Sequence, residues 1–282
     1  MIVSGITTLG SDAIINSVTV GKGANSVATN TVLGNAALDD SVTGGHNTAI
    51  GNAALTANTS GENNTAVGSV SLDVNTTGSS NSALGKSALG GNTTGSQNTA
   101  VGHGSLLSNT TASNSTAVGY LALNLNTTGA SNTAVGAHAL DANTVGTLNT
   151  AVGRECLTAN TTGDKNSAVG KGALGSNTTA DHNTAMGFDA LVNNTSGEQN
   201  TAVGSRCLEG NTTGGYNVAV GYYSLPSNTT GNYNVAVGRS ALTANTTASN
   251  NTAVGYLALL SNTTGVQNVA VGSNALLSNT TA

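Results

Sequence analysis

The hydrophobic and polar residues of this chain repeat with one fixed period. Glycine recurs every seventeen residues from Gly34 to Gly272, fifteen times in all, with no insertion or deletion. The consensus around each glycine reads N-T-A-V-G, two variable residues, A-L, two variable residues, N-T-T-G and two variable residues. A strict repeat of this kind is typical of a solenoid, in which each repeat forms one coil. The sequence therefore predicts an all-β fold, a parallel β-solenoid of fifteen 17-residue coils.

The variable pairs indicate the shape of a coil. Every charged residue within the repeats falls in one of these pairs, as Arg154 and Asp141 do. Three variable pairs separating three fixed segments predict three short strands joined by three solvated bends. We therefore expect a roughly triangular coil.

The fixed segments predict which side chains fill the core. Side chains of a strand alternate between its two faces, so Thr150 and Val152 share one face and Ala151 points the other way. We expect threonine and valine to face inward, together with the leucine that is present in every coil, from Leu38 to Leu276. The alanine, present in fourteen of the fifteen coils, would then form an outward stripe. Such a stripe predicts a subunit interface with another copy of the chain. Its members are Ala49, Ala66, Ala83, Ala100, Ala117, Ala134, Ala151, Ala168, Ala185, Ala202, Ala219, Ala236, Ala253 and Ala270.

Asparagine opens two of the three fixed segments. Neighbouring coils lie about 4.8 Å apart, a spacing at which stacked amides hydrogen-bond along the solenoid. The low share of charged residues, 7%, fits this stacking, because equal charges repeated in every coil would repel. The two predicted ladders include Asn64, Asn81 and Asn98, and Asn58, Asn75 and Asn92.

Residues 1–29 lie outside the register and predict an N-terminal lead-in or cap, which leaves 30–282 as the repeat domain. The sequence stops at the end of a coil, at Ala282, without a comparable cap. An uncapped coil exposes unpaired backbone groups, so end-to-end β-pairing with another molecule is an alternative mode of assembly.

Residues with chemical reactivity are sparse and scattered. Cys156 and Cys207 share one repeat position three coils apart, about 14 Å, which is too far for a disulfide. We expect no catalytic residues, no metal site and no cofactor, and therefore no enzyme. The histidines lie in variable pairs of separate coils, where they cannot converge on a metal. They are His46, His103, His138 and His182.

Tyrosine gives the strongest local departure from the repeat. Tyr216, Tyr222, Tyr223 and Tyr233 lie within two adjacent coils, in bends that should face solvent. Clustered exposed aromatic rings can stack on sugar rings, so these residues are a candidate glycan contact. The alternative is that variable bends accept any residue, tyrosine included.

The net charge of −5 is small and scattered, and it gives no case for nucleic acid as a partner. No apolar run approaches the eighteen or so residues that membrane insertion needs. The expected partners are other copies of the chain, as a homotrimer or a filament, and a cell-surface glycan or protein receptor.

The segments Asn132–Leu140 and Asn200–Leu208 resemble the head repeats of YadA-like trimeric autotransporter adhesins. The stretch Val20–Gly34 and the N-T-T-G spacers are also similar to repeat regions of bacteriophage tail fibres. This resemblance implies a left-handed β-roll, three chains packed side by side, and adhesion at a cell surface or on a virion. The sequence differs from the adhesins in its repeat period of seventeen residues and in having no coiled-coil stalk.

The sequence thus favours a non-enzymatic structural or adhesive fibre segment, extracellular and associated side by side. The first alternative is a filament subunit that polymerises end to end. The second is an ice-binding protein, because regular threonine rows occur on some solenoid antifreeze proteins. Adjacent strand residues face opposite ways, so the N-T-T segment would supply only one outward threonine row.

Overall fold

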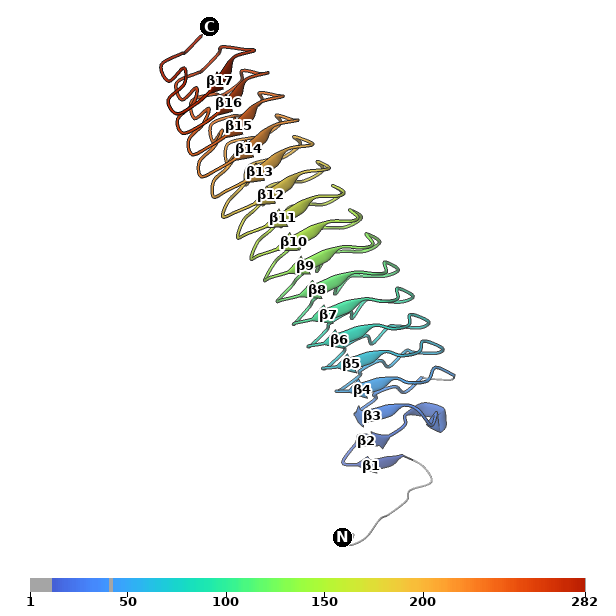
Figure 1. The fold of residues 1–282 in the computed structure, drawn as a ribbon. Coiled ribbons are helices and arrows are strands. Elements are labelled where there is room, and N and C mark those ends of the chain that lie inside the picture. Colours follow the sequence, from blue (N-terminus) through green and yellow to red (C-terminus); the bar gives the residue numbers. More distant parts are fainter. Residues whose placement is uncertain (1–11, 41–42, 282) are drawn as a thin grey trace. The chain divides into compact units, whose positions relative to one another are not determined.

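The computed structural model describes residues 12–40 and 43–281. The chain divides into two compact units, residues 1–117 and 118–282. Each unit is a parallel β-solenoid in which every 17-residue repeat contributes one short strand and a long, hydrogen-bonded turn region (Figure 1). The described residues contain fifteen such strands, β3 to β17, hence about fourteen turns. The predicted fold class is confirmed.

The first unit begins with a hairpin. Strand β1 (Ala13–Ile15) pairs with β2 (Val18–Gly21), and β2 pairs with β3 (Thr31–Gly34), both antiparallel. A 3₁₀ turn, Ala24–Ser26, connects β2 to β3. The hairpin therefore covers one backbone edge of β3. Of the predicted lead-in, residues 1–11 lie outside the described residues.

From β3 onward each strand of the first unit pairs in parallel with the next, and each residue pairs with the residue seventeen positions later. The strands are β4 (Thr48–Ile50), β5 (Thr65–Val67), β6 (Ser82–Leu84) and β7 (Thr99–Val101). Strand β8 (Thr116–Val118) contains the boundary between the units.

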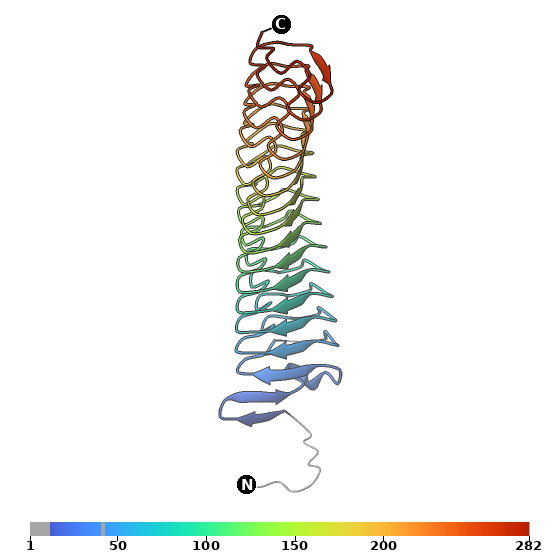
Figure 2. The same cartoon turned by 60° about the vertical axis from the view of Figure 1, so that its left-hand side comes forward.

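The second unit repeats the same register, with one parallel strand in each coil (Figure 2). Its strands are β9 (Thr133–Val135), β10 (Thr150–Val152), β11 (Ser167–Val169), β12 (Thr184–Met186), β13 (Thr201–Val203), β14 (Val218–Val220), β15 (Val235–Val237), β16 (Thr252–Val254) and β17 (Val269–Val271).

The prediction of three strands in each coil is wrong for two of the three segments. The A-L segment and the variable residue before it contain left-handed backbone, with φ 57° at His138 and 50° at Leu140, and a strand cannot contain this conformation. Its backbone still bonds between coils. The N–H of Leu140 donates to the carbonyl of Cys156 at 3.0 Å, and that of His138 to the carbonyl of Tyr120 at 3.0 Å. These segments are stacked turns.

The recurring glycine meets two constraints at once. Gly153 has φ 138°, and a Cβ added there would lie 2.5 Å from the carbonyl oxygen of Gly170 in the next coil. A side chain would therefore be strained by the backbone conformation and would collide with the neighbouring turn. At the two ends of the row one constraint applies: a Cβ at Gly34 would collide with the Gly51 carbonyl, and Gly272 has φ 126°.

The core consists of leucine, alanine and asparagine. The leucine of the A-L segment is buried in every coil from Leu38 to Leu259, as predicted, whereas Leu276 in the last coil is exposed. The prediction of which strand face points inward is wrong. All fourteen stripe alanines face inward, with exposed fractions of 2% or less. A 17-residue coil encloses little space, and its leucine and two asparagines leave room behind the strand only for a methyl group. Threonine and valine therefore point outward, and the alanine methyl groups cannot form a subunit interface.

Both predicted asparagine ladders are present. The amide of Asn75 donates to Oδ1 of Asn58 at 3.0 Å and to the carbonyl of Gly78 at 3.0 Å. In the other ladder the backbone N–H of Asn64 donates to Oδ1 of Asn47 at 2.9 Å. The Asn64 amide also reaches the Gly78 carbonyl, at 2.9 Å, so the two ladders meet at one acceptor. Buried polar side chains thereby satisfy one another along the solenoid.

Candidate interaction surfaces

The outward side of the strands forms a regular surface. We call it the outer strand face; it consists of the threonine, serine or valine that opens each strand and the aliphatic residue two positions later. Its aliphatic residues are partly or largely exposed, for example Leu84 at 52%, Val169 at 39% and Met186 at 45%. No charged residue occupies either row. The outer strand face of each unit is therefore an uncharged strip in which one row is aliphatic and the other is mostly threonine.

The four predicted glycan-contact tyrosines form two separate groups. The rings of Tyr216 and Tyr233, before the strands, stack with centroids 4.9 Å apart and an interplanar angle of 13°. Nε2 of Gln199 donates to the hydroxyl of Tyr216 at 3.2 Å. Tyr222 and Tyr223, after the strand, have centroids 6.0 Å apart. Because Tyr216 and Tyr233 cover one face of each other, they offer less ring surface for sugar stacking than the sequence suggested.

The prediction omitted an arginine that lies between two tyrosine rings. Cζ of Arg239 lies 6.0 Å from the ring centroid of Tyr222 and 5.8 Å from that of Tyr256. All three residues directly follow a recurring glycine, so their spacing of seventeen could have indicated this contact. The second unit thus carries an exposed Tyr–Arg–Tyr ladder.

The N-T-T segment presents a threonine surface. Oγ1 of Thr144 donates to the carbonyl of Thr161 at 3.1 Å, and Oγ1 of Thr161 to that of Thr178 at 3.1 Å. Thr162 and Thr179, the next residues in their coils, are exposed. Because this segment is a bend and not a strand, both threonines of a pair reach the surface. The expectation of a single outward row is wrong for this reason.

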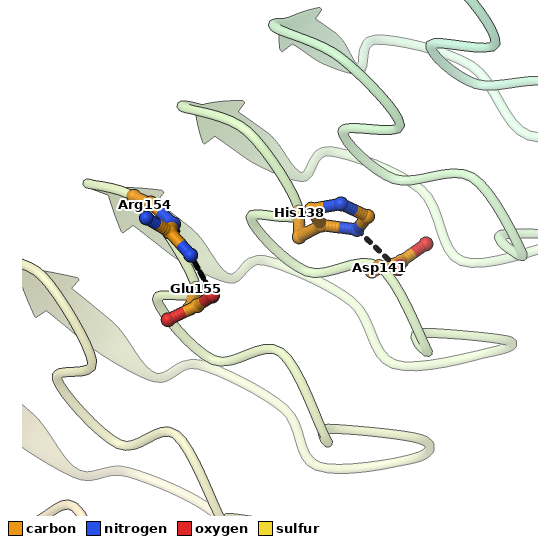
Figure 3. Close-up of polar contacts among 4 residues, drawn as sticks. All are labelled: His138, Asp141, Arg154 and Glu155. Carbon is orange, nitrogen blue, oxygen red and sulfur yellow. Dashed lines mark hydrogen bonds and ion pairs between the residues drawn. The ribbon is translucent and has the colours of Figure 1, made fainter.

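Two local pairs join a histidine or arginine side chain to a carboxylate (Figure 3). Nδ1 of His138 lies 2.9 Å from Oδ2 of Asp141, and Nη2 of Arg154 lies 2.7 Å from Oε1 of Glu155. The ring of His138 also meets that of Tyr120 edge-on, with centroids 5.3 Å apart. Each contact is made between residues of one coil or of neighbouring coils.

The two cysteines are buried and unpaired. Burial raises the pKa of each thiol to about 12, and backbone hydrogen bonds lower it only in part. A thiol with this pKa carries almost no thiolate at neutral pH and is a poor nucleophile. Cys156 and Cys207 stand where alanine is usual and act as small core residues.

Among residues 12–40 and 43–281, no three histidine, cysteine or acidic side chains are grouped so that they could hold a metal ion. Within the same residues, no helix is long and apolar enough to span a membrane.

No protein-family model matches the chain, and no curated protein matches it. The architecture, a β-solenoid repeat protein, therefore rests on the structure itself.

Proposed function

We propose that this protein is a non-enzymatic structural and adhesive fibre segment whose copies associate side by side through the outer strand face. The observation that carries this proposal is the exposed aliphatic row of that face, which is free of charge throughout. Contiguous apolar surface on a soluble protein often marks an interaction site. The absence of charge from the aliphatic row is explained most simply if another surface covers this row.

A second copy of the chain is the partner that fits this row best. The row repeats once in each coil, about every 4.8 Å, so only a surface of the same period can match it continuously. An identical strand face has that period and the same apolar character, and copies of one chain commonly assemble with closed symmetry. The resemblance to trimeric adhesin heads favours three copies and a location at a cell surface or on a virion.

The distribution of reactive groups supports a role without catalysis. The cysteines are buried with raised pKa values, and His138 and Arg154 are each engaged by a nearby carboxylate. Catalysis needs acid, base or nucleophile groups brought together in one cleft. The described coils instead distribute such groups one or two at a time over the bends.

Two lysines on the outer strand face test the proposed interface. Val135→Lys combined with Val169→Lys places charges two coils apart on exposed positions, where they should leave each coil folded. We expect the mass measured by light scattering to fall to that of one chain, 27.3 kDa. The matched control combines Leu125→Lys and Val145→Lys, which are exposed aliphatic residues outside the strands. The proposal fails if both double variants keep the mass of the unmodified protein, or if the control dissociates equally.

Ice binding is the second candidate, and the threonine surface favours it. The hydrogen bonds from Thr144 and Thr161 to the next coil hold their side chains in one orientation, so their methyl groups form an ordered row beside a second exposed row. Ordered threonine rows can organise water in a regular pattern. Thermal hysteresis measures this activity. Thr162→Lys should abolish it and Asn193→Lys should not, whereas no hysteresis in the unmodified protein dismisses the candidate.

A further inference from the structure

The Tyr–Arg–Tyr ladder differs from Arg154 and Lys171, two other cations that directly follow a recurring glycine. Nη2 and Nε of Arg154 bind Oε1 of the adjacent Glu155 at 2.7 and 3.2 Å. Lys171 lies over the Phe188 ring, 5.4 Å from its centroid, and Asp189 follows that ring in the sequence. Arg239 is followed by Ser240, and it is the only Asp, Glu, Lys or Arg residue between 210 and 282. Its charge therefore has no carboxylate nearby in its own segment of the chain.

The aromatic contacts leave the hydrogen-bonding capacity of Arg239 unused. A cation lying over an aromatic ring is attracted by the ring face and does not need its N–H groups for the contact. In the described part of the chain the guanidinium of Arg239 donates no hydrogen bond, and the residue is exposed. Two rings hold the side chain in place, which lowers the entropy lost when it binds a ligand. The result is an oriented, open donor fork.

This donor fork fits an oxyanion. Arginine donors match the two oxygens of a carboxylate or a sulfate, and charge-assisted bonds of this kind are roughly twice as strong as neutral ones. The flanking rings of Tyr222 and Tyr256 are 53% and 46% exposed, and each adds an apolar surface with a hydroxyl group. Aromatic surface of this kind packs against the C–H groups of a sugar ring.

We infer that the Tyr222–Arg239–Tyr256 ladder is a binding site for an acidic polysaccharide, with Arg239 holding a carboxylate or sulfate and the two tyrosines contacting the sugar rings. This inference deepens the adhesive part of the proposed function. An extended sugar chain suits a site whose residues are exposed in three successive coils. Nucleic acid is less suitable, since its binding requires several cations on one face and this site has one.

The probes are polygalacturonate, dextran sulfate, neutral dextran and single-stranded DNA, with binding to the full chain measured by affinity electrophoresis. We expect binding to one or both charged polymers, weakening with salt, and none to dextran. Arg239→Gln should weaken it about tenfold, because a charge-assisted hydrogen bond is lost. Tyr222→Leu and Tyr256→Leu should each weaken it several-fold. Arg154→Gln is the matched control and should change little.

The two charged polymers distinguish carboxylate from sulfate as the bound group. The inference is overturned if Arg239→Gln binds like the unmodified protein, if Arg154→Gln weakens binding as much, or if dextran binds equally well. Preference for single-stranded DNA over both charged polymers also overturns it. Light scattering of each variant distinguishes failure of this inference from failure of the fibre proposal. Arg239 lies outside the outer strand face, so Arg239→Gln should weaken polysaccharide binding without changing the mass of the assembly.

Discussion

The two faces of one strand have opposite roles in this protein. In β10, Ala151 is fully buried, whereas its neighbour Val152 is partly exposed. The inner row is alanine in almost every coil, and the outer row varies among valine, leucine, isoleucine and methionine. A side chain of uniform size in every coil therefore indicates the strand face that packs in the narrow core. Tolerance of several aliphatic residues marks the side that faces solvent or a partner.

The comparison is tested most strongly by one charge placed on either face. Ala151→Glu buries a carboxylate without a partner in a space that fits a methyl group, and should destabilise the protein by several kcal/mol. Val152→Glu places the same group on the outer strand face, where it should weaken association but cost the folded chain itself only about 1 kcal/mol or less. Denaturant unfolding followed by circular dichroism measures both effects. Equal losses of stability would contradict the assigned orientation of the strand.

The buried asparagines are the next largest test. Asn160 donates to Oδ1 of Asn143 at 2.9 Å and to the carbonyl of Gly163 at 3.0 Å, and it accepts from Asn177 at 2.9 Å. Asn160→Leu leaves Oδ1 of Asn143 and one amide N–H of Asn177 buried and unsatisfied, whereas the Gly163 carbonyl still accepts from Asn149. The loss should cost about 2–5 kcal/mol in unfolding free energy. Asn193→Leu is the control, because Asn193 is exposed and bonds only to the carbonyl of Glu209. Similar stabilities for the two variants would argue against a structural role for the ladder.

The cysteines give the smallest effect, and it depends on pH. Their pKa is raised from 9.0 to about 12 in the folded protein, so the folded state keeps protons that the unfolded state loses. Stability should therefore fall as the pH rises from about 9 toward 12, by about 1 kcal/mol for each thiol at pH 10. Replacing both by alanine, the usual residue at that position, should remove this part of the pH dependence. Unchanged pH dependence in the double variant would show that the thiols do not contribute.

The sequence predicted the solenoid, its period, the buried leucines and both asparagine ladders, because each follows from a residue type repeated in every coil. It gave the wrong phase for the strand. Alternation places Ala151 opposite Thr150 and Val152 but does not state which side is inner, and the larger side chains were assumed to fill the core. The better indicator was the uniform alanine, which reflects how narrow the coil is.

Two further differences concern the backbone of the A-L and N-T-T segments and the contacts of Arg239. The A-L and N-T-T segments were expected to be strands because they repeat as regularly as N-T-A-V-G does. Left-handed backbone at Leu140 and His138 turns the chain instead, and nothing in the residue type leucine indicates that conformation. The ladder around Arg239 joins residues in successive coils, whereas the predicted tyrosine cluster was defined by closeness in the sequence. Stacking in a solenoid joins residues seventeen apart.

The central claim is that the outer strand face is covered by other copies of the chain. Light scattering of the unmodified protein at micromolar concentration tests it most directly. We predict a mass that is a small multiple of 27.3 kDa, three copies for a trimer of the adhesin kind. A stable mass of one chain at that concentration would contradict the account, and long fibres one coil in width would favour end-to-end assembly instead.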